Sequence, residues 1–169
     1  MFIQKKIAPA NVVLKLPPAG YDEVQQKEII QHFNGNGTIR LLNSDGANML
    51  LERLCPGRHV IELTKAERDD EATRIFCQIV RQLHSAKGSI GNFKPIAELA
   101  LAFDRYLDTD DKTISTQEVQ QANELYLSLI DSQAMPVLLH GDLHHDNILN
   151  DDVRGWVSID PKGYVAEPM

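Results

Sequence analysis

The chain has few of the features that would place it in a membrane or outside the cell. Its 169 residues include only two cysteines, Cys55 and Cys77, and their spacing is not that of a metal site. So few cysteines, without a pairing pattern, are typical of a reducing compartment. No apolar run approaches the length of a membrane span, and the first residues lack the apolar core of a signal peptide. We therefore expect a cytoplasmic protein that does not enter a membrane.

Positive charge is also scarce. The chain has 17 Lys and Arg against 24 Asp and Glu, which gives a net charge of −7. Binding to nucleic acid requires clustered basic residues, so we expect no nucleic-acid partner. An acidic protein is compatible with a small cationic substrate, although solubility alone makes many proteins this acidic. The hydrophobic content of 43% and charged content of 24% are those of an ordinary folded protein.

One segment has the pattern of a phosphotransfer site. Residues 139–147 read LHGDLHHDN, so four residues separate Asp142 from Asn147, and Asp160 follows thirteen residues later. This is the spacing of a kinase catalytic loop followed by a metal-binding aspartate. Phosphoryl transfer needs a carboxylate that faces the attacking hydroxyl. It also needs oxygen ligands for Mg²⁺, a hard ion. The three residues have the right groups for these tasks.

The surrounding pattern supports this interpretation. Residues 136–139 form a short apolar run that predicts a buried strand leading into the loop. Two further apolar segments, 148–149 and 157–159, are separated by a polar stretch ending in Gly155, which predicts a hairpin. Asn147 and Asp160 would then lie together at the open end of that hairpin.

Other polar residues in this region have simpler interpretations. His144 and His145 are adjacent, so their side chains should diverge, and no third ligand lies nearby in sequence; we do not expect a zinc site. His140 is expected to brace the loop by hydrogen bonding rather than to act as a base. The remaining aspartates are expected to be solvated turn residues: Asp146, Asp151 and Asp152.

The residues 140–144 (HGDLH), together with Asn147, resemble the catalytic loop of the aminoglycoside phosphotransferases. Residues 159–165 (IDPKGYV) and 50–57 (LLERLCPG) resemble the branch that contains streptomycin 6-phosphotransferases and hydroxyurea phosphotransferases. This resemblance implies an α+β, protein-kinase-like fold of two lobes. A partial β-rich N-terminal lobe would span residues 1–55, and a mainly helical C-terminal lobe would span residues 56–169.

The same resemblance assigns roles to the site residues. Asp142 would be the catalytic base, and Asn147 and Asp160 would bind Mg²⁺. The hinge between the lobes would include Glu52 and Leu54 and would read the adenine of ATP through backbone groups. The Glu52 side chain could equally belong to a structural ion pair.

The expected N-terminal lobe begins with an apolar strand over residues 12–16, which carries Lys15. A helix should follow from an N-cap at Asp22 to about Phe33, and then two strands at 38–42 and 48–54, joined by a turn. By the resemblance, Lys15 contacts the ATP phosphates and Glu28 pairs with it. Glu23 is the competing partner.

The expected C-terminal lobe contains three helices besides the catalytic loop and hairpin. The first should run from Thr64 to about His84, with Thr64 and Glu67 forming a capping box. The other two should span residues 95–107 and 116–130.

Relative to the family, we expect a chain shortened at both ends. No glycine precedes Gly20, where the phosphate-covering loop should lie, and the sequence stops soon after Asp160. The expected activity is phosphorylation, using ATP and Mg²⁺, of a hydroxyl on a small cationic aminoglycoside such as streptomycin, which confers resistance. The alternatives are a kinase of another small metabolite on the same scaffold and an inactive shortened fragment. The catalytic residues favour the two kinases, whereas the missing phosphate-covering loop favours the fragment, from which we expect weak or no transfer to streptomycin. The acceptor hydroxyl and the oligomeric state stay open.

Overall fold

The computed structural model describes residues 12–16, 23–111 and 113–168, and the side chains of all of these except residues 23 and 24. The chain forms two compact units. The first unit contains residues 1–88 and 140–162, and the second contains residues 89–139 and 163–169. These units do not follow the expected boundary near residue 55, and the lobes proposed over 1–55 and 56–169 stay a prediction. None of the described helices has the length and apolar character needed to cross a membrane.

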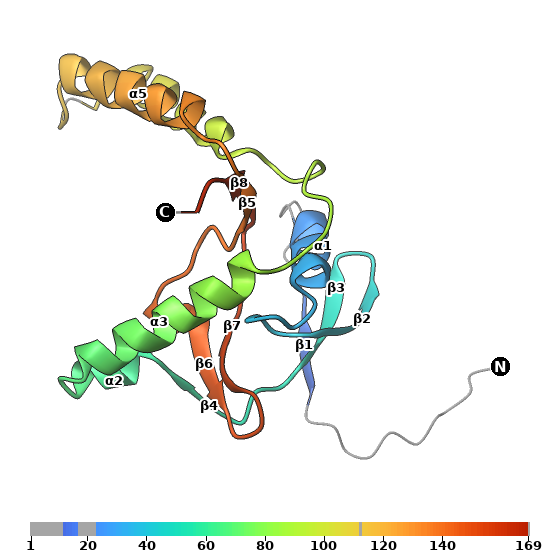
Figure 1. The fold of residues 1–169 in the computed structure, drawn as a ribbon. Coiled ribbons are helices and arrows are strands. Elements are labelled where there is room, and N and C mark those ends of the chain that lie inside the picture. The colour runs from blue at the N-terminus through green and yellow to red at the C-terminus, as the bar shows by residue number, and fades with distance from the viewer. Residues whose placement is uncertain (1–11, 17–22, 112, 169) are drawn as a thin grey trace. The chain divides into compact units, whose positions relative to one another are not determined.

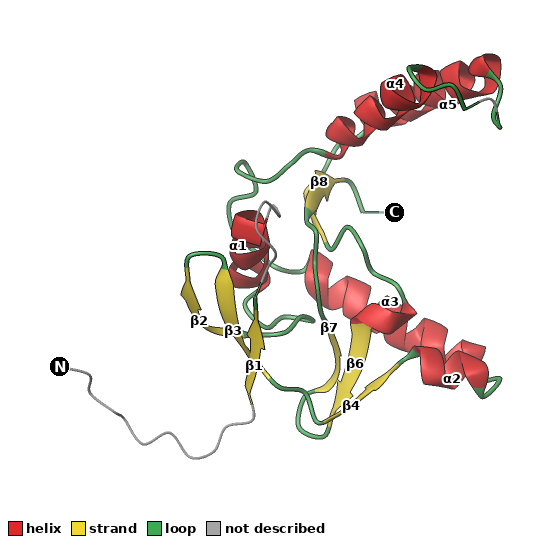
Figure 2. Ribbon diagram, turned by 180° about the vertical axis from the view of Figure 1, so that it is seen from behind, coloured by secondary structure: helices red, strands yellow, loops and turns green. Residues whose placement is uncertain are grey.

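The first unit contains a three-stranded antiparallel sheet in the order β1-β3-β2. Helix α1 lies beside this sheet (Figures 1 and 2). The helix ends where expected, and the expected N-cap at Asp22 lies outside the described residues. The bounds are β1 Val12–Lys15, α1 Glu23–Phe33, β2 Leu41–Asp45 and β3 Asn48–Glu52.

Strand β2 begins three residues later than the sequence pattern predicts. Thr38 forms a parallel bridge with Ser158, and the Ile39 amide donates to the Ser158 carbonyl at 2.8 Å. The segment before β2 is therefore bonded to the other sheet of this unit, and pairing with β3 starts only at Leu41.

The second sheet of this unit has the order β4-β6-β7 and is also antiparallel. Its β6–β7 hairpin confirms the one expected from the polar stretch that ends in Gly155. Helix α3 lies alongside these strands (Figure 2) and buries Ala72, Ile75, Ile79 and Leu83. The bounds are β4 Pro56–His59, α3 Asp69–His84, β6 Ile148–Asp151 and β7 Gly155–Ser158.

The prediction of one helix starting at Thr64 was wrong. A short helix, α2 (Ile61–Lys65), ends before α3 begins, and Glu67 between them has a φ of +59°. A positive φ cannot continue a right-handed helix. The Thr64 hydroxyl donates to the Ile61 carbonyl instead of capping α3, and no side chain caps that helix.

One buried cluster of the first unit joins α1, the first sheet and the β6–β7 hairpin. Its members are Ile30, Ile39, Met49, Leu51, Leu54 and Val157. Because both sheets contribute to this cluster, packing fixes the end of the hairpin relative to β3.

The second unit is built from helices and a two-stranded antiparallel sheet. A capping box between Ser115 and Glu118 begins α5, and the Tyr126 hydroxyl on α5 donates to the Ile96 carbonyl at 2.7 Å. The expected helix at 95–107 is divided between a 3₁₀ turn and α4. The bounds are η1 Ile96–Ala100, α4 Leu101–Leu107, α5 Thr116–Asp131, β5 Val137–Leu139 and β8 Tyr164–Ala166.

Candidate active site

The loop that carries Asp142 is held to the segment after β7 by His140, which is 3% exposed. Its Nε2 lies 2.9 Å from the Ile159 carbonyl oxygen, and its Nδ1 lies 3.3 Å from the Asp142 amide nitrogen. A carbonyl can only accept, so Nε2 carries the proton and Nδ1 accepts. Burial lowers the pKa of His140 to about 4, against weaker opposing effects that include its bond to Ile159. The imidazole is therefore neutral at pH 7 and braces the loop, as the sequence interpretation expects.

Asn147 closes the loop at the start of the hairpin. It ends the 3₁₀ turn η2 (His145–Asn147) and is 9% exposed. Its side-chain Nδ2 donates to the backbone carbonyl of Asp142 at 2.9 Å, and its backbone carbonyl accepts from the Ile159 amide at 2.9 Å. The amide group is thus fixed with its nitrogen on the loop, and its Oδ1 makes no hydrogen bond to a described residue.

Asp160 follows β7 at the other arm of the hairpin and has a φ of +55°. A non-glycine residue in the left-handed region costs about 1–2 kcal/mol, although aspartate tolerates it better than most. Such strain recurs at functional sites, where the surrounding structure holds it in place. The Asp160 side chain is 51% exposed, and its Oδ1 accepts from Lys15 Nζ at 3.1 Å.

Lys15, the last residue of β1, links two segments that lie far apart in the chain. Its Nζ donates to Gln26 Oε1 at 2.7 Å as well as to Asp160. Gln26 in turn donates from Nε2 to the Pro161 carbonyl at 3.2 Å. One glutamine on α1 therefore links the strand lysine to the segment that carries Asp160. Sequence reasoning missed Gln26, because a helix glutamine has no signal of its own.

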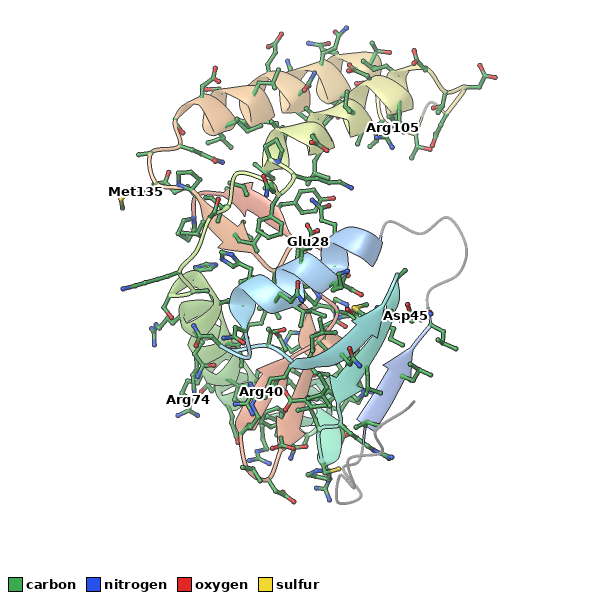
Figure 3. All side chains as sticks on the ribbon, turned by 90° about the vertical axis from the view of Figure 1, so that its right-hand side faces the viewer. Glu28, Arg40, Asp45, Arg74, Arg105 and Met135 are labelled. Carbon is green, nitrogen blue, oxygen red and sulfur yellow. The ribbon has the colours of Figure 1, made fainter. Side chains whose placement is uncertain are left out.

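The expected ion pair between Lys15 and Glu28 is not formed. Glu28 is exposed and makes no ion pair with a described residue. It lies two positions beyond Gln26, which is about 200° around a helix of 3.6 residues per turn, so it faces away from Lys15. Figure 3 labels it on α1. The competing Glu23 has a side chain outside the described residues.

Asp142 has a basic neighbour that sequence reasoning also missed. Its Oδ2 lies 3.0 Å from Lys162 Nζ, and the two side chains are 35% and 54% exposed. The Lys162 amide also donates to the His140 carbonyl at 2.8 Å. The resemblance to the family placed Lys162 in a recognisable segment, but nothing in the spacing showed that it would reach Asp142.

The expected hinge residues have mainly structural contacts. Glu52 is part of β3 and pairs with Arg154, and its Oε1 accepts from the Arg40 amide at 2.8 Å. The Leu54 side chain is 7% exposed and belongs to the core. The side chain of Glu52 is therefore the structural ion-pair member that the sequence allowed, and the adenine-binding role of both backbones stays a prediction.

Taken together, a carboxylate on a braced loop, a fixed carboxamide oxygen and a second carboxylate lie at one end of a hairpin, with two lysines beside them. Carboxylate and carboxamide oxygens suit a hard divalent cation. The lysines suit phosphate oxygens. This set of groups fits metal-assisted phosphoryl transfer.

A comparison with protein families gives the class of this chain. The model of the aminoglycoside/hydroxyurea antibiotic resistance kinases matches residues 3–168. The chain belongs to this kinase family.

Individual relatives cover most of the chain but only part of their own length. The streptomycin 3''-kinase of Klebsiella pneumoniae is 29% identical over 86% of the chain and 53% of the relative. The streptomycin 6-kinase of Streptomyces griseus is 30% identical over 82% of the chain and 46% of the relative. The hydroxyurea phosphotransferase of Kitasatospora aureofaciens is 29% identical over 94% of the chain and 47% of the relative. The chain spans about half the length of the curated relatives it matches.

Solved structures show the same fold at low identity. The aminoglycoside phosphotransferase APH(4)-Ia superposes with a TM-score of 0.62 at 17% identity, covering 85% of this chain and 56% of that one. The choline kinase LicA of Streptococcus pneumoniae superposes with a TM-score of 0.61 at 16% identity, covering 96% of this chain and 60% of that one. The fold is thus of the α+β, protein-kinase-like type, as the sequence predicted.

Proposed function

We propose that this protein transfers the γ-phosphoryl group of ATP to a hydroxyl of an aminoglycoside such as streptomycin, and so confers resistance. The observation that carries the proposal is the arrangement of Asp142, Asn147 and Asp160 at the open end of the β6–β7 hairpin, braced by the neutral His140. A reaction that consumes ATP fits a cytoplasmic protein, and we propose that location.

Asp142 is the residue that faces the acceptor. The acceptor oxygen forms a bond to the γ-phosphorus, the bond from that phosphorus to ADP breaks, and the hydroxyl proton passes to the Asp142 carboxylate. The hydrogen bond from the Asp142 amide to His140 fixes the backbone of this residue. Lys162 Nζ lies 3.0 Å from its carboxylate and holds it, and holding reacting groups in place is the main contribution a protein makes to this reaction.

Mg²⁺ fits the remaining pair of groups. Asn147 would offer Oδ1, because its Nδ2 is held by the loop, and Asp160 would offer a half-exposed carboxylate. The ion would neutralise charge on the phosphate oxygens.

Lys15 would contact the ATP phosphates, and Gln26 would hold it in place, since both of its amide atoms are used in this part of the site. The proposal needs no role for Glu28. The backbone groups of Glu52 and Leu54 would contact the adenine of ATP.

The acceptor class rests on charge and on the relatives. A net charge of −7 favours a cationic substrate, and two of the relatives are named as streptomycin kinases. The match to a hydroxyurea phosphotransferase makes hydroxyurea the competing acceptor to be tested.

The test is ADP release from the 169-residue chain in the presence of Mg²⁺ and ATP, with streptomycin, with hydroxyurea, or with no acceptor. We expect streptomycin-dependent release that falls by about two to four orders of magnitude in Asp142→Asn, the usual size of an acid–base contribution. Asp146→Asn is the matched control, because Asp146 is an exposed aspartate in the same loop. It should keep its turnover.

Growth of a susceptible host that expresses the same variants provides the second readout. No acceptor-dependent release, or equal loss in the two aspartate variants, would contradict the proposal. ADP release with hydroxyurea but not with streptomycin would support phosphoryl transfer and contradict an aminoglycoside as the acceptor.

A further inference from the structure

A polar pocket lies in the first unit and shares no residue with the candidate active site. Its volume is about 200 Å³. The walls come from the loop at residues 35–37 after α1, from Gln82 on α3, and from Arg154 and Trp156 of the β6–β7 hairpin, with Arg40 beside them. Figure 3 labels Arg40 near these strands.

Arg154 is a fixed charge in the pocket wall. Its side chain is 14% exposed and pairs with Glu52. Its Nη2 also donates to the carbonyls of Gly35 and Thr38, at 2.5 and 3.0 Å. These bonds hold the guanidinium in one orientation, so its charge is presented to the pocket without the entropic cost of ordering a flexible side chain.

Arg40 brings a second guanidinium to the same place. Its backbone amide binds Glu52, but its side chain makes no hydrogen bond or ion pair to any described residue. A Cβ at Gly35 would lie 2.9 Å from Arg40 Nε and 3.5 Å from Arg154 Nη2. A Cβ at this position would press on the Arg40 side chain, and the φ of +78° also favours glycine, so glycine here lets Arg40 lie against the loop.

The described residues that line the pocket carry positive charge and no negative charge. Among the described residues that line it, two are cationic and none is a carboxylate. Burial lowers the pKa of Arg154, Glu52 opposes this, and the nearby Arg40 lowers it further. Glu52 offsets most of the charge of Arg154, whereas the Arg40 side chain has no carboxylate partner among the described residues, so an anion in the pocket would be attracted chiefly by Arg40. The side-chain amide of Gln82, which makes no hydrogen bond to a described residue, is a further donor.

We propose that this pocket binds a small oxyanion, either inorganic phosphate or the phosphate group of a small metabolite. Arg40 binds it directly, Arg154 supplies fixed charge, and Trp156 forms an apolar wall. The proposal does not depend on the phosphotransfer activity.

The single tryptophan of the chain makes the site directly observable. Because Trp156 lines the pocket, its fluorescence reports occupancy there and not at the candidate active site. The experiment titrates sodium phosphate into the full chain at constant ionic strength, with sodium chloride as the control. Calorimetry on the same samples gives the dissociation constant and the number of sites.

We expect a saturable change with a dissociation constant of about 1 mM, equivalent to one modest anion site. Arg40→Gln should weaken binding about tenfold or more, because it removes a charge-assisted hydrogen bond. Arg74→Gln is the matched control. Arg74 is an exposed arginine that, among the described residues, bonds to the backbone of its own helix at Asp70. It should bind phosphate within about twofold of the wild type.

A Lys15→Gln/Lys162→Gln double variant separates the two sites. It should keep the phosphate response of Trp156, because neither lysine lines the pocket. Glycerol 3-phosphate in place of phosphate distinguishes the sources: tighter binding assigns the pocket to an organic phosphate, and weaker binding to the free ion. No saturable response in the wild type, an unchanged response in Arg40→Gln, or a response lost in the double variant would overturn the proposal.

Discussion

Replacing His140 by glutamine is expected to destabilise the first unit and to remove part of its pH dependence. The imidazole is 3% exposed and joins the loop at Asp142 to the strand end at Ile159 by two hydrogen bonds. A buried donor or acceptor that is left unpaired costs about 1–3 kcal/mol. Glutamine can restore one of the two bonds, so we expect a loss of about 2 kcal/mol in the free energy of unfolding at pH 7.5.

The pH dependence follows from the pKa of His140, which burial lowers to about 4 in the folded state from a reference value of 6.5. Between these two values the unfolded chain binds the proton and the folded chain does not, so stability falls as the pH falls from 6.5 to about 4. Above pH 6.5 this contribution is fully present. At about 1.4 kcal/mol per pH unit, the free energy of unfolding falls by up to about 3 kcal/mol between pH 6.5 and pH 4.

The assay is urea unfolding at a series of pH values between 4.5 and 7.5, for the wild type and His140→Gln. The difference in unfolding free energy between them should shrink as the pH falls below 6.5 and pass through zero at about pH 5, because the variant lacks the titrating group. His144→Gln is the matched control, since His144 lies in the same loop with its side chain 50% exposed. Parallel pH curves for the wild type and His140→Gln would refute the reasoning.

Two further predictions concern other parts of the first unit. Lys15→Met should weaken ATP binding about tenfold in a calorimetric titration, because a charged phosphate contact is lost, whereas Glu28→Gln and the exposed control Lys65→Met should stay within about twofold. Equal losses in Lys15→Met and Glu28→Gln would show that Glu28 does act through Lys15. Gly37→Ala should lower the free energy of unfolding by about 2–3 kcal/mol, because a Cβ would lie 3.0 Å from Gln82 Cβ at a φ of +74°. Gly46 also has a positive φ, but a Cβ there would meet open space. Gly46→Ala should therefore lower the free energy of unfolding by only about 1 kcal/mol, measured by thermal unfolding. Similar losses at the two glycines would contradict the packing argument.

Features that depend on short segments could be predicted from the sequence. The β6–β7 hairpin follows from a local pattern of apolar segments around a polar turn, and so does its placement of Asn147 beside the strand end that leads to Asp160. The end of α1 at Phe33 follows from the glycines after it.

Features that depend on contacts between distant segments could not. Gln26 reaches Lys15 only because of the phase of α1 against β1, and the same phase turns Glu28 away. Arg154 was part of a polar stretch expected to be a turn. Yet its side chain is mostly buried, because Glu52 and the carbonyls of a loop more than a hundred residues away bind it.

The start of α3 shows a different limit. Thr64 and Glu67 have the spacing of a capping box, but Glu67 has a positive φ and the helix begins at Asp69. The same spacing at Ser115 and Glu118 does form the box. Spacing alone therefore does not define a helix start, because the path of the preceding chain, here the short helix α2, competes with it.

The most direct test of the central claim is binding of Mn²⁺ as a paramagnetic substitute for Mg²⁺, measured by electron paramagnetic resonance in the presence of ATP. The account predicts a site for Mn²⁺ with ATP that weakens by about tenfold or more in Asp160→Asn, because a charged oxygen ligand is lost. Asp152→Asn, at an exposed aspartate in the turn of the same hairpin, should leave the affinity unchanged. Equal affinity in the wild type and Asp160→Asn would contradict the assignment of this hairpin end as the metal and phosphate site.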